Sequence, residues 1–576
     1  MRFFLFWINI YVVVIAVSAC QKRDKSKAVD NKLFFNGEII SMVGDKPEYI
    51  EALVTEGSTI KYTGALDVAL DSFPAAERID LKGQTLLPGF IDGHSHIFNV
   101  GLQGIAANLM APPDGKGKSV RDIKFELKKW IEKNQNLIDQ TGWVIGFGYD
   151  DAYLDRQPDK HDLDAVTSKY PIIIFHQSGH ISTVNSKALE LIGYTEYTPD
   201  PRGGRIRRKG TSNEPNGILE ENAHYELYYN MVLPSFNNDV VLEMLMKGQE
   251  IYVLNGFTTA QEGRTTTEGT RTLEMASENG DLRIDVVSYP DILSNASAIQ
   301  TPFYSKDYYN GYRIGGLKIV LDGTPQGRTA WLTNCYHKHQ DDTCFKGYPA
   351  MDNNKLNEYI DQAYQNNIQI LAHCNGDAAI QQFIDAIRKA NEKYGKSDRR
   401  SVAIHAQTAT EAQLDQFQEE GIFPSFFPTH TFYWGDYHVN SILGEQRAFS
   451  ISPSKSALEK ELKFSLHHDA PVTSPNSMRV LSSAVTRSSR SGRTIGEDER
   501  ISTFYALKAM TIWGAFQHFE EQIKGTLEPG KVADMVVLER NPLKTPPEDL
   551  IDISVAATVK GGEVIYNPGV LDIKGS

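Results

Sequence analysis

Short stretches of alternating apolar and polar residues occupy both ends of this chain. Within residues 31–87, short segments such as 49–54 have this alternation, and positions rich in Gly and Asp separate them. This arrangement is typical of antiparallel strands. The same style returns after Gly525, where 533–538 has the pattern of a further strand. The two halves predict a small β-sandwich that is built from both chain ends, residues 31–87 and 520–572.

The central part of the chain alternates strand-like and helical segments. Helical periodicity is clear at 356–366, 378–394 and 411–420, and this alternation is typical of an α/β fold with a parallel sheet. With the segment before His94 there are eight candidate strands, the number in a (β/α)8 TIM-type barrel, which we place at residues 88–510. The other seven candidates are 256–260, 283–289, 316–321, 368–373, 402–405, 422–426 and 464–467.

Residues from about 103 to 230 do not follow this rhythm. They contain breaks rich in Pro, Gly and Asp, and two strand candidates at 143–148 and 171–177. We therefore expect an insertion that follows the first barrel strand and overhangs the barrel mouth, where long connections commonly carry binding residues.

The first twenty residues have the layout of a signal peptide. A positive start precedes the apolar run Phe3–Val17, and small residues come before Cys20. Residues 17–20 resemble a bacterial lipobox, which would imply removal of residues 1–19 and a lipid on the Cys20 thiol. Because Gln21 follows instead of Asp, the periplasmic face of the outer membrane is the expected location. An uncleaved signal anchor is the alternative.

Composition and charge narrow the range of partners. Hydrophobic residues make up 41% and charged residues 23% of the chain, as in an ordinary globular protein. The net charge of −14 argues against nucleic-acid binding, and the basic run at 202–209 is interpreted as a solvated loop. We expect a small-molecule substrate and membrane contact through the N-terminal lipid only, and leave a homo-oligomer open.

Two of the four cysteines lie in one loop-like segment. Cys335 and Cys344 could pair after export to an oxidising compartment. Free thiols, or a small zinc knuckle with His337 and His339, are the alternatives. The disulfide is favoured, because the ligand spacing fits no common zinc finger. Cys374 is expected to be a small buried hydrophobe.

A His-x-His sequence ends the first strand of the predicted barrel. Because successive strand side chains point to opposite faces, His94 and His96 share a face and can bind one cation. Four further ligand-type residues lie on later strands or at their ends, where barrel active sites form. They are Lys318, His373, His405 and Asp469. This convergence predicts a metal-dependent hydrolase.

The order of these residues resembles that of the amidohydrolase superfamily. Within it, the similarity is to amidohydrolase family 3, the branch that contains N-substituted formamide deformylase and its exported relatives. The supporting motifs span nearly the whole mature chain: 87–96 (LPGFIDGHSH), 179–189 (GHISTVNSKAL), 316–323 (GLKIVLDG), 328–331 (RTAW), 372–377 (AHCNGD), 405–407 (HAQ), 469–471 (DAP) and 530–537 (GKVADMVV).

The resemblance implies that Lys318 is carboxylated on its amine and bridges two divalent ions, with zinc as the expected metal. An unmodified ammonium has no lone pair to donate, whereas a carbamate supplies two oxygens. A single-ion site with Lys318 uncoordinated is the alternative. The ligands of one ion would be His94, His96 and Asp469, and those of the other ion His373 and His405.

Two positions depart from the family pattern. His467 and His468 precede Asp469 where relatives commonly have small residues. By alternation His467 shares the face of Asp469, so we expect it to alter the surroundings of the ligands or to touch substrate. Ile404 stands before His405 where many relatives have Glu, and it should face the helices with little chemical consequence.

Four residues are candidates for binding substrate. His180 and Arg328 are the first choices for polarising a carbonyl oxygen, and His430 is the third. Asp322 shares the inward face of Lys318 on its strand. The alternative for His180 is a core histidine that packs the insertion against the barrel.

Together these residues predict hydrolysis of a carbon–nitrogen amide bond in a small N-acyl or N-formyl compound. A metal lowers the pKa of its bound water to about 7, and Asp469 would take a proton from that water and return it to the leaving nitrogen. The same machinery could instead act on a lactone or phosphoester. A non-catalytic ligand-binding lipoprotein is the other alternative, and the six ligand-type residues count against it.

Overall fold

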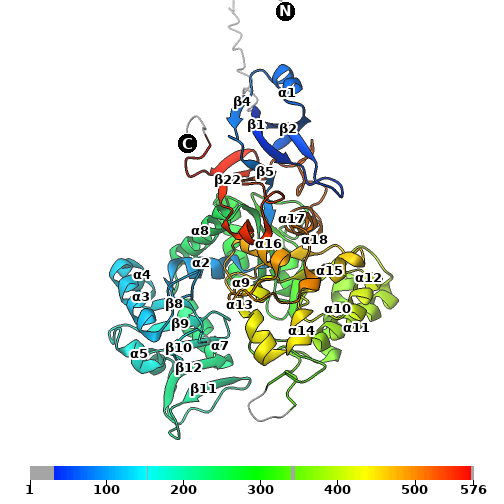
Figure 1. The fold of residues 1–576 in the computed structure, drawn as a ribbon. Helices are drawn as coiled ribbons and strands as arrows, with labels where there is room; N and C mark the ends of the chain where they lie inside the picture. Colours follow the sequence, from blue (N-terminus) through cyan, green and yellow to red (C-terminus); the bar gives the residue numbers. More distant parts are fainter. Residues whose placement is uncertain (1–30, 152, 339–343, 572–576) are drawn as a thin grey trace, which may run out of the picture.

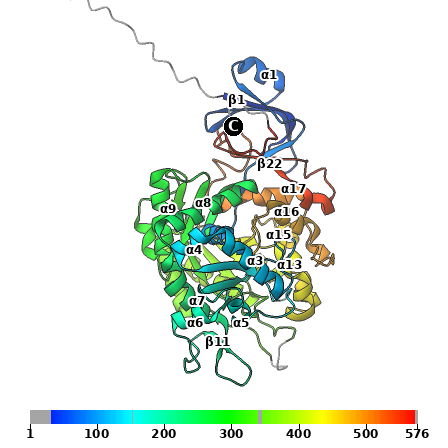
Figure 2. The ribbon, with the colours of Figure 1, turned by 90° about the vertical axis from the view of Figure 1, so that its left-hand side faces the viewer.

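The computed structural model of the protein describes residues 31–151, 153–338 and 344–571. The lipidation candidate Cys20 and the predicted signal peptide, residues 1–19, lie outside them. A small β-domain lies at one pole of an α/β body, and a second lobe lies beside that body (Figures 1 and 2). No helix in these described ranges has the length and apolar character needed to cross a membrane.

Both ends of the chain contribute strands to one eight-stranded sheet, which we call the end sheet. Its order is β23-β22-β21-β5-β1-β2-β3, and β4 pairs with β1. The strands are β1 (Asn31–Ile40), β2 (Tyr49–Glu56), β3 (Thr59–Gly64), β4 (Glu77–Asp80), β5 (Thr85–Pro88), β21 (Met535–Leu538), β22 (Val555–Lys560) and β23 (Glu563–Tyr566).

The long strand β1 makes the end sheet continuous where the sequence predicts a sandwich. Residues 32–35 of β1 pair with β4, and Glu38 and Ile39 pair with β5. A register shift between Phe35 and Ile39 separates these two halves. Strand β1 therefore connects the strands by hydrogen bonds into a single sheet. The sequence predicts a two-layer sandwich at this place.

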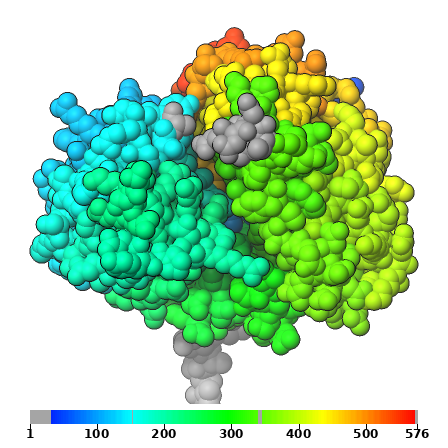
Figure 3. Space-filling view, turned by 90° about the horizontal axis from the view of Figure 1, so that it is seen from below, coloured from blue at the N-terminus to red at the C-terminus, as the bar shows by residue number. Residues whose placement is uncertain are grey.

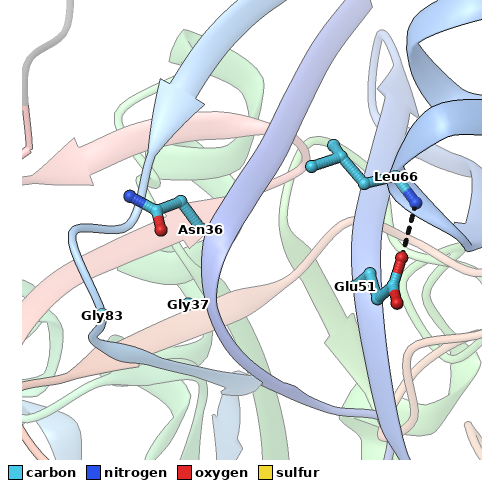
Figure 4. A pocket seen from close by; sticks show the side chains of 5 residues that line it. All are labelled: Asn36, Gly37, Glu51, Leu66 and Gly83. Carbon is cyan, nitrogen blue, oxygen red and sulfur yellow. Dashed lines mark hydrogen bonds between the residues drawn. The ribbon is translucent and has the colours of Figure 1, made fainter.

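A surface pocket of the end sheet has no catalytic groups. Figure 4 shows its lining residues, which are Asn36, Gly37, Glu51, Leu66 and Gly83. Glu51 is the one ionised side chain among them, and its Oε2 accepts a hydrogen bond from the Leu66 N–H at 3.0 Å. This carboxylate therefore holds the start of helix α1 (Leu66–Ser72), and the pocket has no part in the predicted chemistry.

The α/β body contains parallel strands at the places that the hydrophobic pattern predicts. In the described part of the chain they form a four-stranded and a five-stranded sheet and not one closed barrel. A bridge between Asp291 and Lys318 joins the two sheets on one side. On the other side, Asp469 N donates to His94 O at 3.1 Å. The strands are β6 (Phe90–Ile91), β13 (Phe257–Thr265), β14 (Asp285–Pro290), β15 (Tyr312–Ile314), β16 (Leu317–Val320), β17 (Ile370–Cys374), β18 (Ser401–His405), β19 (Ile422–Phe426) and β20 (Ser465–Leu466).

Amphipathic helices follow most of these strands. In α11, Ile380, Phe383 and Ile387 recur at helical spacing and are buried against the strands. Helix α12 begins with a capping box between Thr410 and Gln413, which satisfies the first free backbone N–H groups. The principal helices of the body are α2 (Ile97–Ile105), α8 (Asn238–Leu254), α9 (Thr267–Asn279), α10 (Asn353–Gln365), α11 (Asp377–Tyr394), α12 (Glu411–Glu420), α13 (Thr429–Tyr437), α16 (Ser477–Thr486), α17 (Thr503–Met510) and α18 (Ile512–Gln517).

Residues within the predicted insertion form the second lobe, which has its own sheet and apolar core. Seen from the pole opposite the end sheet, a hollow separates this lobe from the rest of the body (Figure 3). The strands of the lobe are β7 (Ala107–Asn108), β8 (Val144–Tyr149), β9 (Ile172–His176), β10 (Ile181–Val184), β11 (Gly204–Arg208) and β12 (Pro215–Glu221), and its helices are α3 (Val120–Lys133), α4 (Gln135–Thr141), α5 (Lys160–Asp164), α6 (Ser186–Ile192) and α7 (Asn222–Leu227).

Candidate metal centre

The ends of strands β6 and β20 bring the His-x-His pair next to Asp469. His94 Nε2 lies 3.6 Å and His96 Nε2 lies 3.5 Å from Asp469 Oδ1. From strand β16, at the opposite edge of the sheet that contains β20, Lys318 Nζ reaches to 2.9 Å from His94 Nε2. These four side chains therefore share one small buried space at the carboxyl ends of the strands.

The ends of β17 and β18 bring a second pair of imidazoles to the same carboxylate. His405 Nε2 lies 3.9 Å from Asp469 Oδ2 and 3.1 Å from His373 Nδ1. Asp469 thus turns one oxygen toward the first histidine pair and the other oxygen toward the second. The structure brings all six predicted ligands together.

Two of these ligands have an unusual backbone conformation. The φ angle is 70° at His405 and 50° at Asp469, in the left-handed region that residues with a Cβ seldom adopt. Such conformations cost free energy and persist only where the surrounding structure imposes them. The hydrogen bond from Asp469 N to His94 O is one such constraint.

Burial favours the neutral forms of most of these side chains. It lowers the pKa of Lys318 to about 7, so much of this amine is uncharged near neutral pH. Burial also lowers the pKa of His373 to about 3 and holds the pKa of His94 and of His405 well below the usual imidazole value. A neutral imidazole has the lone pair that a metal ion needs.

His96 differs from the other histidines in its charge. Burial opposes its charged form, but attraction to the carboxylates of Asp469 and Glu262, at 3.5 and 3.6 Å, outweighs burial and raises the pKa of His96 to about 9. The protonated ring therefore balances two carboxylates. A cation bound between these groups would replace that proton.

The donor set fits a divalent metal ion. Asp469 Oδ1 is buried and has no hydrogen-bond partner among the residues that the structure describes, which is costly for a carboxylate oxygen. Imidazole nitrogens and a carboxylate oxygen are the donors that zinc takes in catalytic sites. An ion at this place would satisfy the orphaned oxygen.

Two residues in the middle of β13 support the first histidine pair, and they lie just beyond the strand that the sequence pattern predicts. Gln261 Oε1 lies 2.6 Å from His94 Nδ1, and Glu262 Oε1 lies 3.6 Å from His96 Nδ1. The predicted strand stopped at residue 260, just before them. Extending its strand pattern by two residues would have placed Gln261 and Glu262 at the same rim as the ligands.

A second group of ligand-type residues lies in the insertion. Ligand atoms of Asp150, Asp151 and His176 lie within 4.8 Å of one another. The Ser178 N–H donates to His176 Nδ1 at 3.0 Å, so the proton of the neutral ring is on Nε2. This Nε2 lies 3.1 Å from Asp151 Oδ1. The Nε2–H of this ring therefore already has a carboxylate as its hydrogen-bond partner.

His180 directly precedes strand β10 of the second lobe. Its Nδ1 lies 2.9 Å from Glu221 Oε2 and 3.2 Å from the Tyr225 hydroxyl. A contact of His180 with substrate stays a prediction. The side chain of His180 is 29% exposed, so it remains accessible to a small molecule.

Two other substrate candidates are held by neighbouring loops and helices. Arg328 donates to the Tyr437 hydroxyl at 2.9 Å and to Ser441 O at 3.2 Å. His430 is buried, and its Nδ1 lies 3.1 Å from His438 Nε2. Both residues brace the segment around α13, and a contact with substrate stays a prediction for them.

Asp322 holds the loops next to His373. Its carboxylate accepts hydrogen bonds from the backbone N–H groups of Trp331 and Asn375 at 2.9 Å and of Gly376 at 2.8 Å. Both oxygens are engaged in this way, and the residue is 3% exposed. These hydrogen bonds hold the loops that contain Trp331 and Asn375. A contact between Asp322 and substrate stays a prediction.

The predicted disulfide is present in the structure. Cys335 and Cys344 are joined, with their Cα atoms 5.0 Å apart. Cys374 is a buried free cysteine, as expected. The covalent link closes the loop between β16 and α10, next to the segment that Arg328 braces.

A parallel α/β body whose strand ends converge on imidazoles, a lysine and a carboxylate is typical of metal-dependent hydrolases with a TIM-type barrel. This chain belongs to the amidohydrolase family, whose family model matches residues 77–566, and within the superfamily it is a member of family 3. The resemblance stated from the motifs is thereby confirmed.

Individual relatives match along most of the chain. The chain is 27% identical over 562 residues to the putative amidohydrolase YtcJ of Bacillus subtilis, covering 93% of this chain and 99% of that protein. It is 25% identical over 536 residues to the N-substituted formamide deformylase of Arthrobacter pascens, covering 90% and 95%. An uncharacterized metal-dependent hydrolase from Pyrococcus furiosus has a similar structure, with a TM-score of 0.71, 23% identity, and coverage of 89% and 100%. The structural likeness shows the fold and implies a TIM-type barrel.

Proposed function

We propose that this protein hydrolyses a carbon–nitrogen amide bond, other than a peptide bond, in a small N-acyl or N-formyl compound. The observation that carries the proposal is the position of Asp469 Oδ1, which is buried, unpartnered among the described residues, and about equally far from His94 and His96. The similarity to a formamide deformylase supports this bond type.

The centre is proposed to hold zinc ions. His94, His96 and Asp469 would hold one ion, and the second histidine pair another, with carboxylated Lys318 between them. The lowered pKa of Lys318 supports the modification, because the neutral amine is the form that adds carbon dioxide. When bound, such an ion supplies a Lewis acid and brings the pKa of its water to about 7. A single-ion centre is the alternative.

Asp469 is proposed to move the proton during hydrolysis. Its position between the histidine pairs lets it take a proton from the attacking water and return it to the leaving nitrogen. His180, which Glu221 orients through a 2.9 Å contact, is proposed to assist at the carbonyl oxygen of the substrate. This assignment accounts for the exposed face of that ring.

A substrate panel tests the proposed bond. Purified protein, with and without added zinc, is given N-formyl, N-acyl and cyclic amide compounds together with a lactone and a phosphotriester. Zinc-dependent release of amine or ammonia is the expected result. Release of a hydroxy acid, or of an alcohol together with a phosphodiester, without amine would favour ester chemistry. No turnover of any compound by zinc-loaded protein would contradict the catalytic role.

We also propose that the chain is exported and lipidated on Cys20. The signal-peptide layout of residues 1–19 supports this. The test is metabolic labelling with radioactive palmitate in a bacterial host, followed by membrane fractionation. Wild-type protein should carry label in the membrane fraction, and Cys20→Ser should lose it. Cys374→Ser is the matched control because Cys374 is buried, and label lost equally from both variants would contradict the proposal.

A further inference from the structure

His467 is part of a buried chain of hydrogen bonds that ends at His405. His467 Nε2 lies 3.1 Å from His405 Nδ1, and its Nδ1 lies 2.9 Å from Ser425 Oγ. Ser425 Oγ in turn lies 2.7 Å from Ser465 Oγ, and Ser465 Oγ donates to Gln517 Oε1 at 2.6 Å. Each of these five side chains is at most 2% exposed.

The far end of this chain is fixed by the backbone. Gln517 Nε2 donates to Gly93 O at 2.6 Å, so Gln517 Oε1 is the atom that accepts from Ser465. Ser465 Oγ is also the donor toward Ser425 Oγ at 2.7 Å, so the Ser425 hydroxyl can either accept from His467 Nδ1 or donate to it.

The contacts of His405 match the tautomer that an ion requires. An ion at His405 Nε2, which lies 3.9 Å from Asp469 Oδ2 and 3.1 Å from His373 Nδ1, needs the ring proton on Nδ1. His467 Nε2 lies 3.1 Å from that Nδ1 and can accept its hydrogen bond, while His467 donates its own Nδ1–H to Ser425. The ring of Phe427 stacks on His467 with the centroids 5.1 Å apart, which fixes the plane of the imidazole.

The Gly93 carbonyl also supports a second histidine. Gln261 Nε2 donates to Gly93 O at 2.9 Å, and Gln261 Oε1 accepts from His94 Nδ1 at 2.6 Å, so His94 directs an unprotonated Nε2 toward the centre. One backbone oxygen therefore orients two glutamines: Gln261 beside His94, and Gln517 at the end of the chain that leads to His405. A Cβ at position 93 would lie 2.6 Å from Ser465 Oγ, so this arrangement requires glycine.

We propose that His467 is a positioning residue of the metal centre, which holds His405 in the tautomer and orientation that can bind an ion. The inference rests on the proposed function, because it takes His405 as a metal ligand. Partners that hydrogen-bond to a ligating imidazole commonly change metal affinity by about 10–100-fold when they are removed.

The experiment measures zinc affinity by competition with a coloured chelator, and the visible absorption spectrum of the cobalt-loaded protein. His467→Phe keeps a flat ring against Phe427 but removes the acceptor, and His467→Gln restores an acceptor. Ser425→Ala removes the partner of His467 Nδ1 with a smaller change of shape. His224→Phe is the matched control, because it replaces another buried imidazole, stacked on Tyr228 in the insertion.

Zinc affinity is expected to fall about 10–100-fold in His467→Phe, with a changed cobalt spectrum, and by less in Ser425→Ala. His467→Gln should recover most of the affinity, and His224→Phe should bind like wild type. Equal affinity of wild type and His467→Phe would overturn the inference alone. Wild-type protein that binds no divalent ion would overturn the proposed function as well. If His467→Phe does not fold, the comparison of Ser425→Ala with wild type decides in the same way.

Discussion

Buried charged side chains are paired differently at the two ends of the parallel strands. At the amino ends, Glu520 Oε1 accepts from Arg313 Nη2 and from the Tyr308 hydroxyl, both at 2.6 Å, and its Oε2 lies 3.2 Å from Lys524 Nζ. Lys524 also pairs with Asp285 at the start of β14. Every charge in this cluster thus has an opposite charge in contact.

At the carboxyl ends, the charged and polar groups are left incompletely satisfied. Asp469 Oδ1 and Glu520 Oε2 both lack a hydrogen bond within the described ranges, but Glu520 Oε2 lies 3.2 Å from a lysine nitrogen. Asp469 Oδ1 lies 3.5 Å and 3.6 Å from two imidazoles, of which only His96 is protonated. His405 and Asp469 also have left-handed backbone angles. Unpaired buried groups and strained backbone cost free energy. The comparison shows that one rim of the strands is arranged for stability, and the other is arranged to receive a ligand.

The largest effect is expected from removing the carboxylate of Asp469, at the carboxyl ends of the strands. Asp469→Asn should lower kcat/KM about a thousandfold or more, because it removes the proton acceptor and an anionic ligand. Asp469 Oδ1 has no hydrogen bond to lose, and its protonated neighbour His96, at 3.5 Å, keeps the contact with Glu262. The free energy of unfolding of the metal-free protein should therefore fall by less than in Glu520→Gln. Steady-state kinetics and urea unfolding check these two results, and a loss of stability as large as that of Glu520→Gln would break the comparison.

Removing the carboxylate of Glu520, at the amino ends of the strands, should have the opposite effects on stability and on activity. Glu520→Gln leaves Arg313 without its counter-charge and Lys524 with Asp285 alone, and breaking a buried ion pair costs about 3–5 kcal/mol. The free energy of unfolding should fall by that order, while kcat/KM of the folded fraction stays at the wild-type value. Chemical unfolding together with activity measured below the transition tests this. A large loss of kcat/KM in folded protein would contradict the separation of roles.

A smaller effect is expected at Gln261, which contacts a ligand without being one. Gln261→Leu removes the acceptor of His94 Nδ1 and should weaken zinc binding about tenfold or more. Gln382→Leu is the matched control, because Gln382 is also buried but donates to Met351 O far from the ligands. Chelator competition measures the zinc affinity of both variants. Equal affinity in the two variants would contradict a role for Gln261 in zinc binding.

The smallest effect concerns pH. Burial raises the pKa of Glu520, but attraction to Lys524 and Arg313 outweighs burial and holds its pKa well below the usual value of about 4.3. A lowered folded-state pKa adds stability above the unfolded-state pKa, and this stability is lost as the pH falls. The stability difference between wild type and Glu520→Gln should therefore be constant near neutral pH and shrink from about pH 5 downward. Urea midpoints across this range measure it, and a difference that grew toward acid would have the wrong sign.

Local sequence patterns predict much of the fold and of the metal centre. Strand-length apolar runs end in His94, His373 and His405, so alternation and strand polarity alone place these side chains at one rim. The disulfide between Cys335 and Cys344 was favoured from spacing and compartment, and it is present.

Features that depend on distant contacts were not predictable from the chain. The role of His467 requires Ser425, Ser465 and Gln517 to be in line, and nothing in their sequence spacing indicates this. The continuity of the end sheet depends on a register shift within β1, which the alternating pattern does not reveal. Asp322 has the alternation expected of an inward residue, but loop N–H groups take up its carboxylate.

The end sheet and the hollow of the α/β body lie at opposite poles of the molecule (Figures 1 and 3). The described chain begins at Asn31 in the end sheet, so a tether joined to the chain before Asn31, through lipid or through coupling to a solid support, would be connected to the end-sheet pole. The hollow, and with it the proposed catalytic site, would then face bulk solution, and molecules attached side by side on a bead or vesicle would not block one another's entrances. Immobilised protein should accordingly turn over small substrates at the rate of the free form.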